Sequence, residues 1–156
     1  MPELRISATR LIAAPTEVVY RCIADYRMHH HQFLPPAFSR YEVVKGGVGA
    51  GTVIRFRLTI AGRGQNAEAL VAEPEPGRVL TESYEGTGAV TMFRVVPKRA
   101  GTLVVIETVS PSTGIRGAIE RLIAPLLFRR LYNDELTRLD RYARSQAATQ
   151  RGKRSR

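Results

Sequence analysis

The central part of the chain, residues 41–109, alternates between apolar and polar positions in short runs that glycine and proline separate. In the run 52–60, four apolar side chains from Ile54 to Ile60 fall on one face of a strand, and Arg55 and Arg57 fall on the other. The gaps between runs are too short for crossover helices, so the strands are expected to be antiparallel neighbours with one face in water. With the first run of the chain, the expected strands cover residues 3–13, 41–44, 52–60, 68–73, 79–84, 90–96 and 103–109.

Two short helices are expected between the first and second strands. Pro15 suits the first turn of a helix, where its missing N–H costs nothing, and Glu17 favours the positive end of the helix dipole. Apolar residues at positions 18, 19, 22 and 23 supply a buried face, which makes Cys22 a core residue rather than a nucleophile. Residues 25–34 are expected to form the second helix, which two prolines end.

A long amphipathic helix is expected at the end of the chain. From Thr113 to about Ala148 the apolar positions recur every three or four residues. The charged residues of this segment, Glu135 among them, are expected mostly on the opposite face. Pro125 lies inside the run, and its missing N–H and its clash with the preceding turn predict a bend without a break.

These elements predict an α+β fold, in which the long C-terminal helix covers the apolar face of a twisted antiparallel sheet. A curved sheet and a bent helix need not close on each other completely, and a gap between them would form an apolar pocket. One such domain accounts for residues 1–149. The Gly/Ser/basic segment 150–156 is expected to be a disordered tail.

Composition and charge restrict the class of protein further. A chain of 156 residues with 44% hydrophobic residues can bury one core, and no apolar stretch approaches the ~20 residues of a membrane span. One cysteine excludes an internal disulfide, and the start of the chain has no export signal, so a cytoplasmic protein is expected. The net charge is +10, but four positive charges lie in the last six residues. We interpret that tail as a solvated end; weak contact with an anionic membrane stays an alternative, and no motif for specific nucleic-acid binding accompanies it.

Several short motifs, in this order along the chain, resemble those of one superfamily. The strand-to-helix segment Ala-Ala-Pro-Thr-Glu-Val-Val-Tyr at residues 13–20, followed by Ile-Ala-Asp at 23–25, is similar to the opening of START-like SRPBCC proteins. That superfamily includes polyketide cyclase/dehydrase and lipid-transport proteins and birch-pollen-allergen-like proteins. The resemblance covers roughly residues 5–145. Its further motifs are at residues 49–52, 73–80, 101–102 and 120–125.

The resemblance implies a helix-grip fold, with a seven-stranded sheet wrapped around the long C-terminal helix and a cavity for hydrophobic small molecules. It implies no cofactor. The sequence departs from the family pattern at residues 28–38, where members often carry a Trp-Pro-like segment and this chain has no tryptophan at all. That segment borders the cavity mouth in the family, so ligand specificity does not carry over. We expect residues 33–38 to act as a lid.

Glu82 and Tyr84 are the candidate catalytic residues. If Leu80 faces the core, the period of two places Glu82 and Tyr84 inward as well. A buried glutamate with a raised pKa beside a tyrosine hydroxyl could perform enolisation or dehydration, as a cyclase requires. The alternative, which we favour from the sequence, is that Glu82 faces water or pairs with Arg55 or Arg57.

The three histidines of the chain are consecutive, at positions 29–31, and do not predict a metal site. Consecutive side chains on a helix point about 100° apart and cannot meet one ion. We expect a helix surface or pocket rim there, with His30 as a polar cavity group. The glycine-rich run Gly46–Gly51 leads into a strand rather than a helix, so it predicts a hairpin turn and not a phosphate site.

The function expected from the sequence is binding of a hydrophobic or amphipathic small molecule, such as a lipid, isoprenoid or polyketide-like compound, between sheet and helix. Two alternatives stay open: an aromatic polyketide cyclase/dehydratase that uses Glu82 and Tyr84, and an interaction module whose basic tail contacts anionic lipid or nucleic acid. The expected ligand-binding residues are Arg10, His30, Phe33, Phe38, Ile54, Phe56, Leu58, Thr91, Phe93, Leu122, Leu126 and Tyr132.

Overall fold

A single antiparallel sheet of seven strands, in the order β1-β7-β6-β5-β4-β3-β2, forms most of the fold. The computed structural model describes residues 3–111 and 118–156, and the side chains from residue 125 onward within the last helix. The elements in chain order are β1 (Glu3–Ile12), α1 (Thr16–Ala24), the 3₁₀ helix η1 (His30–Phe33), β2 (Phe38–Lys45), β3 (Val53–Ile60), β4 (Arg63–Glu75), β5 (Val79–Tyr84), β6 (Val90–Lys98), β7 (Gly101–Pro111) and α2 (Ala118–Arg154).

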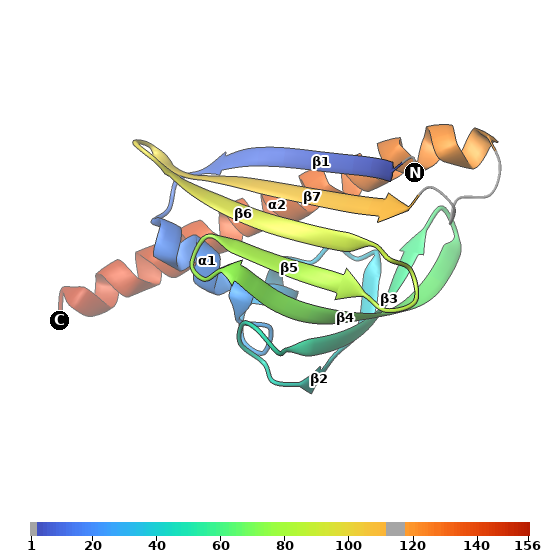
Figure 1. The fold of residues 1–156 in the computed structure, drawn as a ribbon. Helices are drawn as coiled ribbons and strands as arrows, with labels where there is room; N and C mark the ends of the chain where they lie inside the picture. Colours follow the sequence, from blue (N-terminus) through green and yellow to red (C-terminus); the bar gives the residue numbers. More distant parts are fainter. Residues whose placement is uncertain (1–2, 112–117) are drawn as a thin grey trace.

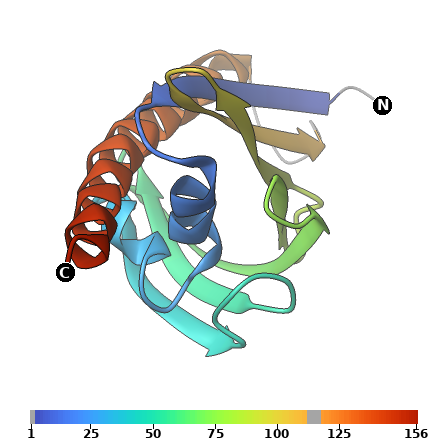
Figure 2. The ribbon, with the colours of Figure 1, turned by 90° about the vertical axis from the view of Figure 1, so that its left-hand side faces the viewer.

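The sheet curves around the long helix, as the predicted helix-grip fold requires. Figure 1 shows α2 running behind the sheet along its length. Seen from one end, the strands curl round an interior, α2 closes the open side and α1 lies across the near end (Figure 2). The contacts agree with this view, because α2 packs on β1 and η1 and α1 packs on α2, β6 and β7.

Alternation along the strands sets which side chains fill the interior. In β3, Ile54 and Phe56 are buried and Arg55 is exposed, as the sequence predicts. The exposed Arg55 forms an ion pair with Glu68 of the neighbouring strand at 2.6 Å. The helix contributes a matching apolar face at a spacing of three or four residues, made of Tyr132, Leu136, Leu139, Ala143 and Ala147.

Two of the motifs that carry the family resemblance have structural roles. At Gly101, a Cβ atom would lie 2.1 Å from the carbonyl oxygen of Ile12, so only glycine permits this approach of β7 to the end of β1. The neighbouring Thr102 is fully buried and donates to the Ala14 carbonyl at 2.8 Å. The run Gly46–Gly51 connects β2 to β3, so the predicted hairpin is confirmed.

The structure differs from the prediction between α1 and β2. Residues 25–34 do not form an α-helix; only His30–Phe33 are helical, in a 3₁₀ turn. The Asp25 carboxylate accepts hydrogen bonds from the backbone N–H groups of Arg27 and Met28, at 3.2 and 2.9 Å, as a helix N-cap does. The backbone N–H groups of His29 and His30 both donate to the Asp25 carbonyl, so the capped segment forms one turn and then the 3₁₀ turn, without a regular α-helix.

The last helix is longer than expected. It is continuous across Pro125 and runs to Arg154, into the segment 150–156 that the sequence analysis treats as a disordered tail. The charged residues there are helix formers, and positive charge is favourable at a helix C-terminus. Residues 151–156 are all exposed. None of the described helices is long and apolar enough to cross a membrane.

Candidate functional site

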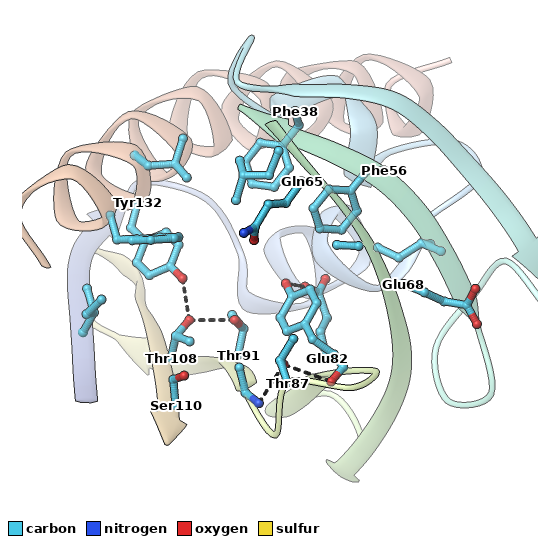
Figure 3. A pocket seen from close by; sticks show the side chains of 18 of the residues that line it. Phe38, Phe56, Gln65, Glu68, Glu82, Thr87, Thr91, Thr108, Ser110 and Tyr132 are labelled. Atoms are coloured by element: carbon cyan, nitrogen blue, oxygen red, sulfur yellow. Dashed lines mark hydrogen bonds between the residues drawn. The ribbon is translucent and has the colours of Figure 1, made fainter. Parts of the chain in front are cut away.

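A cavity of about 620 Å³ lies between the concave face of the sheet and α2. Its volume is within the range of small-molecule sites in proteins. Figure 3 shows aromatic rings, including Phe38 and Phe56, on one side of this space, and the hydroxyl groups of Thr91, Thr108 and Tyr132 on another. The cavity therefore combines apolar walls with a localised group of polar side chains.

The polar side chains form a row across neighbouring strands. Glu82 of β5 lies directly opposite Thr91 of β6, which lies directly opposite Thr108 of β7. The two threonine hydroxyls hydrogen-bond at 2.6 Å, and that of Thr108 also contacts the hydroxyl of Tyr132 on α2 at 2.5 Å. Residues paired across strands share a face. The register thus sets three polar groups along the cavity wall, and α2 adds the hydroxyl of Tyr132.

Glu82 faces this cavity and not water. Its side chain is buried, with a relative exposure of 4%, and the interpretation favoured from the sequence is wrong. Tyr26 donates to Oε1 and Tyr84 donates to Oε2, each at 2.7 Å. Both carboxylate oxygens therefore have partners, which makes burial of the group tolerable. Arg55 pairs with Glu68 instead, and Arg57 donates to Asn66.

His30 lies beside this carboxylate, with one nitrogen fixed by the backbone. Nδ1 lies 2.7 Å from the carbonyl oxygen of Ile23 and must donate to it, because a carbonyl oxygen only accepts. Burial lowers the pKa of His30, against a smaller opposing effect of the Glu82 charge. In the neutral ring, Nε2 therefore carries a lone pair, 3.6 Å from Oε1 of Glu82. The ring stacks on Tyr26, with centroids 4.3 Å apart.

The other two histidines point elsewhere, as expected for consecutive residues. His29 contacts the hydroxyl of Tyr142 at 2.6 Å, and His31 lies near the Tyr41 ring. Among the residues that the structure describes, no group of three or more His, Cys, Asp or Glu side chains could hold a metal ion.

The tyrosines around Glu82 are held in the protonated, donating form. Burial, and next the negative charge of Glu82, raises the pKa of Tyr26 and of Tyr84 well above the ordinary value. Burial also raises the pKa of Tyr132 to about 12. These hydroxyls keep their protons at neutral pH, and those of Tyr26 and Tyr84 donate hydrogen bonds to Glu82.

Glu135 of α2 is a cavity residue that the sequence analysis places on the wrong face. Its relative exposure is 3%, and it lines the cavity. Burial, followed by the charge of Glu82, raises the pKa of Glu135 well above its ordinary value, so the folded protein favours the neutral acid. A signal was present in the sequence: Glu135 lies three residues after Tyr132 and four before Leu139, on the face of the helix that these residues bury.

Three predicted ligand-binding residues lie away from the cavity. Arg10 donates to Asp140 at 2.8 Å and is largely exposed, because β1 meets α2 at that point. Leu126 is 59% exposed, since it lies on the side of α2 opposite the lining residue Phe128. Phe33 is fully buried against His30 but does not line the cavity. The side chain of Leu122 lies outside the described residues.

The other predicted site residues surround one cavity. The alternation along β3, β5 and β6 places the strand residues among them on the interior face of the sheet. Thr108 and Glu135 also line the cavity, and the fully buried Tyr26 contacts the lining residue Glu82; none of the three is among the predicted site residues. The predicted residues that line the cavity are His30, Phe38, Ile54, Phe56, Leu58, Glu82, Tyr84, Thr91, Phe93 and Tyr132.

Residues 3–144 match the family model described as polyketide cyclase / dehydrase and lipid transport, and the chain belongs to this family. The NMR structure of the KanY protein (ms6282) is similar at a TM-score of 0.81, with 28% identity over 92% of this chain and 99% of that one. The crystal structure of TTHA0849 from Thermus thermophilus has a TM-score of 0.75 and 21% identity over the same shares. A search of curated proteins gives no match.

The Zhui aromatase/cyclase from Streptomyces sp. R1128 has a TM-score of 0.72 and 19% identity, over 92% of this chain and 94% of that one. These likenesses agree with the curved sheet and long helix described above. The family and its aromatase/cyclase neighbour support a role in ligand binding or cyclisation and leave the substrate open.

Proposed function

We propose that this protein binds an amphipathic small molecule in the cavity between the sheet and α2, with no cofactor. The observation that carries the proposal is the cavity itself, about 620 Å³ with mainly apolar and aromatic walls and polar groups gathered around Glu82. Each ligand methylene that moves from water into such a space contributes roughly 0.8 kcal/mol. The polar groups would set the orientation of the ligand.

A matched pair of tryptophan variants tests this proposal. Leu58 of β3 lines the cavity, whereas Leu70 of the neighbouring strand β4 is exposed and does not. Leu58→Trp is expected to fill part of the cavity and weaken binding of a neutral naphthalene probe at least tenfold by calorimetry, roughly 1.4 kcal/mol. Leu70→Trp makes the same chemical change outside the cavity and is expected to leave binding unchanged. Equal affinities for both variants and the wild type would place binding elsewhere.

Native mass spectrometry of the purified protein, followed by solvent extraction, gives the class of any bound compound. A co-purifying lipid, isoprenoid or aromatic polyketide would support the proposal and identify the ligand class. Release of that compound by Leu58→Trp, and not by Leu70→Trp, would assign it to the cavity.

Cyclisation or dehydration is the second candidate function, and the geometry of Glu82 favours it. A carboxylate at the cavity surface can accept a proton from the carbon next to a ketone, while the electron pair moves onto the carbonyl oxygen. The neutral Glu135 acid on the opposite wall could protonate that oxygen, giving the enol. As the enol carbon attacks a second carbonyl of the same chain and forms a carbon–carbon bond, the enol hydroxyl would return its proton to Glu135 and the attacked oxygen would take the proton held by Glu82, giving a β-hydroxy ketone. Glu82 could then remove a second proton from the carbon between the carbonyl and the hydroxyl-bearing carbon, and the C–O bond would break with the hydroxyl leaving as water after protonation by Glu135.

This second candidate predicts a separation of binding from turnover. Glu82→Gln keeps the shape of the side chain but cannot accept the proton, so turnover of a polyketone substrate should be abolished while the substrate still binds. A variant that turns over at the wild-type rate excludes Glu82 as the base. Product analysis by mass spectrometry, together with calorimetry of substrate binding, measures both quantities.

A further inference from the structure

The lining of the cavity has the opposite charge to the chain as a whole. The sequence carries a net charge of +10. Among the described residues that line the cavity, four are glutamates and none is lysine or arginine. Glu68, near the rim, is already paired with Arg55, but Glu82 and Glu135 are buried inside without a cationic side chain beside them in the described part of the chain.

Two hydrogen-bond acceptors face each other at the Glu82 end of the cavity. Oε1 of Glu82 and the unprotonated Nε2 of neutral His30 are 3.6 Å apart, with no proton between them. Both residues line the cavity and are nearly fully buried. A ligand that brings an N–H donor would satisfy acceptors that the described side chains leave only partly satisfied.

Glu135 supplies a second, independent observation. Its carboxyl group is 3% exposed and lines the cavity, and no hydrogen bond joins it to any other described residue. A carboxyl group that lines a cavity can pair with a donor that a ligand brings. The negative charge of Glu82 acts on it across the cavity, so a cation placed in this space would be attracted by both carboxyl groups.

The aromatic walls suit such a ligand as well. Phe38 and Phe56 pack against each other with centroids 5.2 Å apart, and Phe56 meets Tyr84 edge-on at 6.2 Å. Aromatic faces attract ammonium groups and also bury apolar surface. A ligand with an aromatic body and a protonated nitrogen matches both parts of the cavity.

We infer that the cavity selects amphipathic amines, which place a protonated nitrogen at Glu82 within electrostatic reach of Glu135, and that it rejects carboxylates. This inference rests on the proposed binding function and names the chemical class of its ligand. A carboxylate ligand would add a third acidic group to a space where the described residues provide no cation. A fatty-acid-like ligand is therefore excluded, although the surface charge of the protein would attract it.

Three probes on one aromatic scaffold test the inference: naphthylmethylamine, naphthylmethanol and naphthoate. Calorimetry at neutral pH is expected to give the tightest binding for the amine and the weakest for naphthoate, with a difference of at least about tenfold. The net positive charge of the protein favours the reverse order, so general attraction cannot produce this result. Equal affinities, or a preference for naphthoate, would overturn the inference and leave the cavity function standing. Binding of none of the three would overturn both.

Substitutions that remove one carboxyl group assign the selectivity to the cavity. Glu82→Gln and Glu135→Gln are each expected to weaken binding of the amine by about tenfold, with a smaller change for the alcohol. Glu107→Gln is the matched control for Glu82→Gln, because Glu107 pairs with Arg5 away from the cavity and its loss removes one negative charge from the protein. A loss of amine binding in all three variants would contradict a role of the cavity. If Glu82→Gln does not fold, Glu135→Gln carries the test.

Proton release gives a readout independent of affinity. A bound ammonium group should ionise the neutral Glu135, so calorimetry in buffers of different ionisation enthalpy should detect a released proton. Besides Glu135, the described titratable groups that line the same cavity are His30, Glu68, Glu82, Tyr84, Glu85 and Tyr132, and Glu135→Gln leaves all of them in place. The release is expected in the wild type and not in Glu135→Gln. Equal proton release in both proteins would refute the assignment of the amine to this end of the cavity.

Discussion

Removal of the Glu82 carboxylate should destabilise the fold mainly through Tyr26, whose hydroxyl donates a hydrogen bond to that carboxylate. Tyr26 is fully buried, and Glu82 is the described partner of its hydroxyl group, at 2.7 Å. Glu82→Leu leaves that hydroxyl without an acceptor, which costs about 1–3 kcal/mol. The hydroxyl of Tyr84 also loses its acceptor, but this residue is only half-buried and lines the cavity, so water can replace the carboxylate there.

A double-mutant cycle isolates the contribution of Tyr26. The substitution Glu82→Leu also changes packing and removes a charge near Glu135, and these effects are common to every background. In a Tyr26→Phe background no buried hydroxyl is left without an acceptor, so Glu82→Leu should lower the free energy of unfolding by about 1–3 kcal/mol less than it does in the wild type. In a Tyr84→Phe background the reduction should be smaller. Urea unfolding followed by far-ultraviolet circular dichroism measures all of these, since the chain contains no tryptophan. Equal costs in the wild-type and Tyr26→Phe backgrounds would refute the reasoning.

Three further predictions concern single groups. Burial raises the pKa of Glu135 in the folded protein above its ordinary value of 4.5. The free energy of unfolding should therefore fall as pH rises from 4.5 to the raised pKa, by at most about 1.4 kcal/mol per pH unit. Urea unfolding across pH should show that Glu135→Gln removes this fall; an unchanged slope assigns it elsewhere. Burial raises the pKa of Cys22 to about 12, so a thiol reagent should label it only in urea, and rapid labelling of the folded protein would contradict this. Asp140 accepts from Arg10 at 2.8 Å and from Arg144 at 3.0 Å, so Asp140→Asn should cost about 1 kcal/mol in thermal unfolding, less at high salt, and an unchanged Tm would count against these pairs.

The sequence predicts the fold well because the spacing of its apolar residues differs between strands and helices. A spacing of two residues gives a strand one apolar face, and a spacing of three or four gives a helix one. Strand β5 begins and ends where expected, at Val79 and Tyr84. Other strands extend beyond their apolar runs, as in β4, because hydrogen bonds to a neighbouring strand continue through polar residues such as Gln65, opposite Leu58. The expected helix over residues 25–34 is wrong, because after the turn that Asp25 caps only His30–Phe33 are helical, in a 3₁₀ turn.

The candidate site is predicted only in part, because its polar groups have partners that are distant in the sequence. Period-two alternation places Glu82 inward, but the cost of burying a lone carboxylate argues against it. Tyr26, 56 residues earlier in the chain, removes that objection by donating to Oε1. No pattern around either residue predicts this contact. Glu135 is a different case. The helical period places it on the buried face of α2, whereas its charge favours an exposed position, and the structure buries it.

The polarity of the cavity follows from pairs of residues rather than from single side chains. The backbone carbonyl of Ile23 fixes which nitrogen of His30 carries the proton, and Tyr26 occupies one lone pair of Glu82. The end of the cavity is therefore rich in acceptors because of α1 and the turn after it, although the carboxylate belongs to β5. The segment after Asp25 is also where the sequence departs from the usual pattern of its family, with histidines where others often have a Trp-Pro-like motif. A change of residues in this one segment can reset the hydrogen bonding and charge that a ligand meets without any change in the sheet. In the proposed site, selection of the ligand therefore depends on this segment together with Glu82 of β5 and Glu135 of α2, two elements of the fold itself.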